Sequence, residues 1–214
     1  SSEYQDHAEL FDALYDDAAR RLDEFTPSDL ANTVWAHARA KSRRMRELLI
    51  SAEPIIAAKM SAFDAPELGL VVWSYAKAGQ LGTDRLFALV GDRLLLPDAG
   101  LNRLSPAGLA TICWAFSKAE QQYEELFNAI ARLTERRAHQ FDAQSLATIA
   151  LAFARAGYAD DGLFQALASA SALRVEEFTP HGLAVADRAF KLVGQSGGLH
   201  EAIRQAAVRR TFRR

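Results

Sequence analysis

The segment Phe25-Thr-Pro-Ser-Asp-Leu-Ala-Asn-Thr-Val-Trp-Ala-His-Ala-Arg-Ala-Lys41 decides the fold, because altered copies of it return four more times. The copies begin at Phe63, Leu104, Phe141 and Phe178. A shared leucine recurs after 38, 41, 37 and 37 residues, at Leu30, Leu68, Leu109, Leu146 and Leu183. This period is typical of stacked helical repeats, in which one unit cannot bury its apolar face alone. The sequence therefore predicts a function on a long repeated surface rather than in a pocket.

Each copy reads as a helical hairpin. The first helix starts near a proline, where the missing N–H costs nothing, at Pro27, Pro66, Pro106 and Pro180. It ends at Gly79, Gly157 and Gly194, or at Lys41 and Glu120 in the other copies. The second helix begins near a pair of large apolar residues, namely Leu48-Leu49, Leu86-Phe87, Leu126-Phe127 or Leu163-Phe164.

We therefore predict an all-α, right-handed α-solenoid with about eleven helices and no strands. Its repeats are about 38 residues long. We expect one solenoid domain over residues 1–214, in which residues 1–24 hold an orphan second helix, from His7 to Glu24. The five predicted repeats are residues 25–62, 63–103, 104–140, 141–177 and 178–214.

Composition narrows the class of protein. Half of the residues are hydrophobic, and the net charge of −2 argues against a general polycation. No stretch approaches the ~20 uninterrupted apolar residues of a membrane span. The one cysteine, Cys113, excludes an internal disulfide framework and suits a reducing compartment. The chain starts at Ser1 without a secretory signal, which fits either a removed leader or a fragment.

The candidate binding surface is one stripe of each first helix. Two other stripes are apolar, but this third one combines small residues, a polar position and a basic residue in the last turn. The basic residues are Arg39, Lys77, Lys118 and Arg155, and the polar ones include Asn32, Thr111 and Thr148. Stacked helices would align these cations in a column that follows a phosphate backbone, while the polar residues face bases. The alternative is that each cation only complements its helix dipole.

Two further sets of residues, arginines and tryptophans, are of types that contact RNA. Arg43 and Arg44 belong to a basic run from Arg39 to Arg46, and we include them among the candidate RNA-binding residues. The tryptophans Trp35, Trp73 and Trp114 lie on an apolar stripe, and we expect them in the core rather than stacked on bases.

Catalysis has little support in the sequence. The five histidines have no metal-ligand spacing, and we expect His37 to be a packed ring. Cys113 lacks a nearby histidine to activate it, and residues 194–198 lack the Lys-Ser/Thr ending of a phosphate loop. We expect a non-catalytic protein without metal or cofactor.

The string Leu-Ala-x-x-x-Trp-Ala-x-Ala-Lys/Arg-Ala stands at Leu30–Ala40 and, with substitutions, at Leu68–Ala78, Leu109–Ala119 and Leu146–Ala156. It resembles the octotricopeptide and heptatricopeptide repeats, and the repeats ahead of the RAP domain in FAST-kinase-like organellar proteins. The resemblance implies an α-solenoid of a mitochondrion or chloroplast that binds an organellar transcript or rRNA. The implied roles are RNA processing, stability, translation and ribosome assembly, including membership of a mitochondrial ribosome.

The chain also departs from those families. The repeats run up to Arg214, so we expect no RAP-like domain within residues 1–214. The fifth repeat has Arg188 where the others have Trp or Leu, and Leu192 where the others have a cation. We therefore expect the basic column to end before the fifth repeat.

The rival function is a protein–protein scaffold subunit of a large organellar complex. It is favoured by the neutral overall charge and by the acidic first 24 residues. RNA binding should weaken steeply with salt, whereas a scaffold should keep its partner at high salt. A ribonucleoprotein subunit would bind RNA and other protein subunits on different faces.

Overall fold

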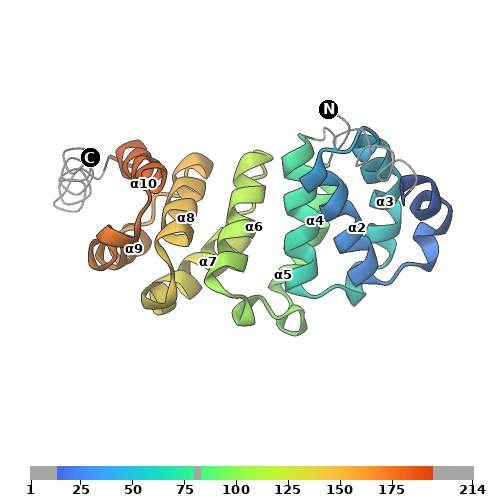
Figure 1. The fold of residues 1–214 in the computed structure, drawn as a ribbon. Coiled ribbons are helices and arrows are strands. Elements are labelled where there is room, and N and C mark those ends of the chain that lie inside the picture. The colour runs from blue at the N-terminus through green and yellow to red at the C-terminus, as the bar shows by residue number, and fades with distance from the viewer. Residues whose placement is uncertain (1–13, 80–82, 195–214) are drawn as a thin grey trace, which may run out of the picture. The chain divides into compact units, whose positions relative to one another are not determined.

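The computed structural model describes residues 14–79 and 83–194, and its ribbon consists of helices joined by short turns (Figure 1). Residues 14–21 are helical. The helices that follow are α2 (Pro27–Ala40), α3 (Met45–Ala58), α4 (Ala65–Ala78), α5 (Asp84–Leu95), α6 (Pro106–Lys118), α7 (Glu124–Arg137), α8 (Ala143–Ala156), α9 (Asp161–Leu173) and α10 (Pro180–Leu192). Single 3₁₀ turns are η1 (Leu22–Glu24), η2 (Met60–Ala62), η3 (Pro97–Ala99), η4 (Leu101–Arg103), η5 (Ala138–Gln140) and η6 (Val175–Glu177).

The all-α class is confirmed, since no strand occurs in residues 14–79 and 83–194. The start of the predicted orphan helix, with His7, and the predicted second helix of the fifth repeat lie outside the described residues. No helix of the described part combines the length and the apolar character needed to cross a bilayer.

The first helices begin and end as their residues dictate. At the start of α2, Thr26 Oγ1 accepts from the Asp29 N–H at 3.2 Å, and the Asp29 carboxylate accepts from the Thr26 N–H at 3.0 Å. This reciprocal capping satisfies two N–H groups that an isolated helix end leaves unpaired. Asp64 and Glu67 repeat the arrangement in α4. Single caps come from Ser105, Asp142 and Thr179 at α6, α8 and α10.

The predicted helix ends are confirmed by the backbone. Gly79, Gly157 and Gly194 have positive φ angles, which glycine adopts without strain. Lys41 and Glu120 stand at the equivalent positions with φ angles of 52° and 56°, in the left-handed region that disfavours side chains. All five first helices are therefore followed by a residue with a positive φ angle.

The chain forms two compact units, Ser1–Leu101 and Asn102–Arg214, which we call the amino-terminal and carboxy-terminal units. In the amino-terminal unit, α2 packs against α4, and α3 packs against α2 and α5. In the carboxy-terminal unit, α8 lies between α6 and α10, while α9 packs against α7 and α8. First helices thus contact first helices in each unit, which is the packing of an α-solenoid.

The repeated apolar residues form the core. The shared leucines Leu30, Leu68, Leu109, Leu146 and Leu183 are at most 2% exposed. The large apolar pairs that open the second helices are buried as well. In the amino-terminal unit, the Tyr75 hydroxyl donates to the Leu49 carbonyl oxygen at 2.7 Å and so joins α4 to α3. Within each unit, neighbouring first helices therefore pack against one another, and α2, α4, α6 and α8 each pack against the second helix of their own repeat.

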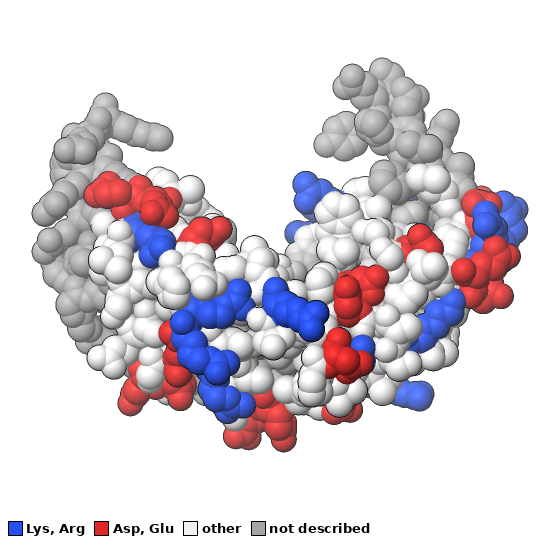
Figure 2. Space-filling model, turned by 90° about the horizontal axis from the view of Figure 1, so that it is seen from below, with Lys and Arg blue, Asp and Glu red and all other residues white. Residues whose placement is uncertain are grey.

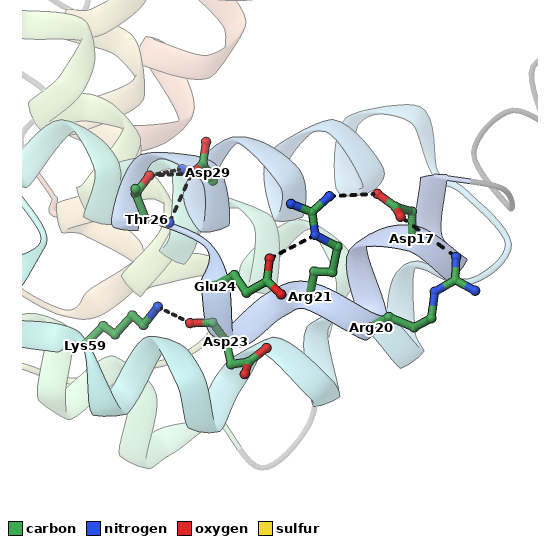
Figure 3. A network of polar contacts seen from close by, with 8 residues as sticks. All are labelled: Asp17, Arg20, Arg21, Asp23, Glu24, Thr26, Asp29 and Lys59. Carbon is green, nitrogen blue, oxygen red and sulfur yellow. Dashed lines mark hydrogen bonds and ion pairs between the residues drawn. The ribbon is translucent and has the colours of Figure 1, made fainter.

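A basic residue at or near the end of each described second helix (α3, α5, α7 and α9) bonds to backbone carbonyl oxygens at or near the start of its repeat. Lys59 Nζ donates to the Asp23 carbonyl oxygen at 2.6 Å (Figure 3). It also donates to the Phe25 carbonyl oxygen at 2.6 Å. Corresponding bonds run from Arg93 to Phe63, from Arg137 to Asn102 and Leu104, and from Arg174 to His139, across 30 to 35 residues. The sequence alone did not predict these hydrogen bonds, although a cation recurs 30 to 34 residues after the first residue of each of these repeats.

Candidate nucleic-acid interface

The four predicted cations of the basic column are all exposed. Each stands in the last turn of a first helix: Arg39 in α2, Lys77 in α4, Lys118 in α6 and Arg155 in α8. Because α2 packs against α4, and α6 against α8, the cations form two pairs on neighbouring helices, one in each unit.

These cations are not neutralised by carboxylates. Among the residues that the structure describes, none of the four forms an ion pair, although other basic residues do. The Arg39 guanidinium instead lies 5.3 Å from the centroid of the Trp35 ring. Figure 2 shows both basic and acidic side chains on the face that it draws.

The predicted polar positions use part of their hydrogen-bonding capacity within their own helices. Asn32 Nδ2 donates to Ser28 Oγ at 3.3 Å, and the Thr111 hydroxyl donates to the Ala107 carbonyl at 2.8 Å. The Thr148 hydroxyl donates to the Gln144 carbonyl at 2.8 Å and accepts from the Gln144 side chain at 3.3 Å. These side chains are exposed or half-buried, so Asn32 and Thr111 retain acceptor oxygens for a ligand.

The two candidate arginines from the basic run, Arg43 and Arg44, differ in their contacts. Arg43 is exposed between α2 and α3. Arg44 contacts Asp16 at 2.6 Å and Glu47 at 2.9 Å, and its guanidinium lies 3.7 Å from the Tyr15 ring centroid. These contacts join the helical residues 14–21 to α3, and for this reason we leave Arg44 out of the proposed RNA surface.

Two adjoining cavities lie in the carboxy-terminal unit. One, of about 480 Å³, is lined by Lys118, Gln121 and Arg155, among others. The other, of about 430 Å³, is lined by side chains of α6, α8 and α10, including Trp114, Arg155 and Arg188. Ser117 and Arg155 line both, so the surface is continuous from Lys118 to Arg188.

This geometry corrects one expectation. Trp35, Trp73 and Trp114 are half-buried rather than core residues, because their position lies at the border between a buried stripe and the exposed one. In the fifth repeat, Leu192 stands at the position of the basic column, while Arg188, one helical turn earlier, is exposed and lines the same cavity as Arg155.

Two of the residues considered for catalysis, His37 and Cys113, lie in the buried part of the fold, whereas residues 195–198 lie outside the described residues. His37 is buried, with Nδ1 2.8 Å from Ser42 Oγ, as expected for a packed ring. Cys113 is buried, and burial raises the pKa of its thiol. In the described part of the chain, no group of three or more His, Cys, Asp and Glu side chains is placed to hold a metal ion.

Stacked helical hairpins whose first helices pack against one another define a helical-repeat protein. The chain belongs to the family described as RNA-editing substrate-binding complex 6 protein (RESC6), which it matches over residues 5–197. No curated protein matches the chain. The family is thus an RNA-associated one, but it is not one of the octotricopeptide, heptatricopeptide, RAP or FAST-kinase-like families that the repeat string resembles. The leucine of that string is buried between helices, and helical repeats of different families bury such residues in the same way.

Proposed function

We propose that this protein is a non-catalytic, RNA-binding component of an RNA-editing substrate-binding complex. Membership of the RESC6 family carries the proposal. We place the protein in the mitochondrion. The chloroplast and the ribosome, which the repeat resemblance implied, receive no support from this family.

The first helices supply the RNA surface. Arg39 and Lys77 on one pair of neighbouring helices, and Lys118 and Arg155 on another, offer exposed charge that no described carboxylate neutralises. Phosphate contacts of this kind fix the position of a strand without reading its sequence. The small residues beside these cations let the strand approach the helices closely.

The family description names a complex, which supports protein partners beside RNA. Large apolar side chains are exposed on both kinds of helix, since Ile50 in α3 is 58% exposed, Leu173 at the end of α9 is 83% exposed and Leu192 at the end of α10 is 54% exposed. Such partners are therefore not assigned to one face.

Salt-dependent RNA binding tests the proposal. A fluorescent single-stranded RNA is titrated with wild type and with a variant in which Arg39, Lys77, Lys118 and Arg155 are alanine, at low and physiological salt. The matched control changes four exposed second-helix arginines to alanine, namely Arg46, Arg85, Arg132 and Arg136. Both variants lose the same charge, two residues from each unit, and circular dichroism checks that both remain helical.

We expect the first-helix variant to lose most of its affinity. The slope of log affinity against log salt should fall by about 0.7 for each phosphate contact removed. The control should bind nearly as wild type does. Equal losses of RNA affinity in both variants would show that only the net charge matters and would contradict a first-helix surface. Absence of RNA binding by wild type would overturn the proposal and favour the protein scaffold.

A further inference from the structure

We propose that the 430 Å³ cavity lined by α6, α8 and α10 binds one nucleotide of single-stranded RNA, with the base beside Trp114 and the flanking phosphates at Arg155 and Arg188. The inference rests on the proposed RNA binding and names a site for it. All the lining residues belong to the carboxy-terminal unit, so this one unit builds the site.

The cavity has the size and lining that a nucleotide needs. Pockets for small ligands start at about 300 Å³ and combine apolar walls with a few polar groups. Here Leu151 and Val185 are apolar, whereas Gln144, Thr148 and His181 are polar. A base could thus lie against apolar side chains while its edge meets donors and acceptors.

Trp114 provides the stacking surface. It is half-buried and lines the cavity, which leaves part of the indole accessible. Every base has a π-face, so stacking on an aromatic side chain is strong without being specific for sequence. The next first helix has Leu151 at the same repeat position, so the site holds one tryptophan.

The charge of the cavity selects an anion. No Asp or Glu lines it, and two exposed arginines do. Neither Arg155 nor Arg188 forms an ion pair with any residue that the structure describes. Because Arg155 also lines the neighbouring cavity with Lys118, the backbone of a bound strand would pass from Arg188 over Arg155 to Lys118.

Substitutions at Trp114 test the stacking. Wild type, Trp114→Leu and Trp114→Phe are titrated with a fluorescent oligouridylate. Leucine stands at the same position in the next repeat, so Trp114→Leu should remain folded. We expect Trp114→Leu to weaken binding about 5- to 150-fold and Trp114→Phe to restore most of it. Equal affinity of all three proteins would overturn the stacking role.

Substitution of Arg188 tests the phosphate contact. Arg188→Ala should reduce the salt slope by about 0.7, while the exposed Arg136→Ala should leave it unchanged. Photocrosslinking of wild type to a 4-thiouridine oligonucleotide should label a peptide that contains residues 114–118. This readout needs no variant, and the absence of a label on that peptide would overturn the site.

The outcomes separate this inference from the proposed function. If the first-helix quadruple variant loses RNA binding while Trp114→Leu and Arg188→Ala bind as wild type does, the cavity is not the site, but the protein still binds RNA. If wild type does not bind RNA at all, both fail.

Discussion

Arg137 Nη2 donates a hydrogen bond of 2.9 Å to the Leu104 carbonyl oxygen, 33 residues earlier, and so ties the end of α7 to the start of the same repeat. A second bond of 3.1 Å joins Arg137 Nη1 to the Asn102 carbonyl. Lys59, Arg93 and Arg174 make corresponding bonds in the other described repeats. The repeats thus carry two kinds of cation: one closes the hairpin, and the other, at the end of the first helix, remains exposed.

Removal of a hairpin-closing cation should destabilise the protein. Arg137→Met keeps the length of the side chain but leaves two carbonyl oxygens without their charged donor. We expect a loss of about 1–3 kcal/mol in the free energy of unfolding, measured by urea denaturation. Arg136→Met is the control, because Arg136 is exposed and makes no ion pair among the described residues. Equal stability of the two variants would show that these bonds contribute nothing.

The ion pair of Arg93 and Asp98 should make the stability of the fold depend on pH in the acidic range. Arg93 is buried, and its Nη1 lies 2.7 Å from Asp98 Oδ1. The hydrogen bond from Arg93 holds the pKa of Asp98 below its usual value. Because the folded-state pKa is lower than the unfolded one of about 3.9, ionised Asp98 stabilises the fold at neutral pH, and this contribution is lost as pH falls below about 4.

Asp98→Asn should therefore lower the melting temperature at pH 7 and come closer to wild type near pH 2.5. The exposed Asp23, which forms no ion pair in the described structure, offers the control Asp23→Asn. A constant difference between Asp98→Asn and wild type at all pH values would contradict an electrostatic contribution.

Glycine at a strained helix end should stabilise the chain. Glu120 has a φ of 56°, whereas the equivalent residues after α4, α8 and α10 are glycines. Glu120→Gly removes a side chain from the left-handed region, and we expect a net gain of up to about 1 kcal/mol. The reverse change, Gly157→Ala, should lower stability. Thermal unfolding measures the melting temperature of both variants. A melting temperature of Glu120→Gly at or below that of wild type would show that Glu120 is not strained.

The thiol of Cys113 should be inert in the folded protein. It is 1% exposed, and burial raises its pKa, so the reactive thiolate is scarce. Reaction with a thiol reagent should be slow in buffer and fast in denaturing urea. Since Cys113 is the only cysteine, total thiol absorbance reports it alone. Rapid reaction in buffer would show that the α6 core opens.

Arg155 should matter more to RNA binding than the other basic column residues. It lines both cavities of the carboxy-terminal unit, whereas Lys118 lines one. Arg155→Ala should therefore weaken binding of a single-stranded RNA more than Lys118→Ala does, in fluorescence anisotropy at physiological salt. The same loss from both substitutions would show that each cation acts as an independent phosphate contact.

The local pattern of the sequence was enough to predict the helices. The prolines and polar caps start the first helices, and glycine or a left-handed residue such as Lys41 ends them. The period of the leucines predicted which face is buried, because a helix repeats every 3.6 residues and each copy sets the same register. The exposure of Arg39, Lys77, Lys118 and Arg155 followed from the same register.

The tertiary structure decided what each exposed residue contacts. Whether an arginine is paired depends on residues far along the chain: Arg44 meets Asp16, and Arg137 meets Leu104, while Arg155 meets no carboxylate that the structure describes. The half-burial of Trp114, and the cavity it shares with Arg188, arise from the packing of α6, α8 and α10. A repeat period fixes the face of a helix on which a side chain lies, but only the packing of separate helices brings distant side chains into one site.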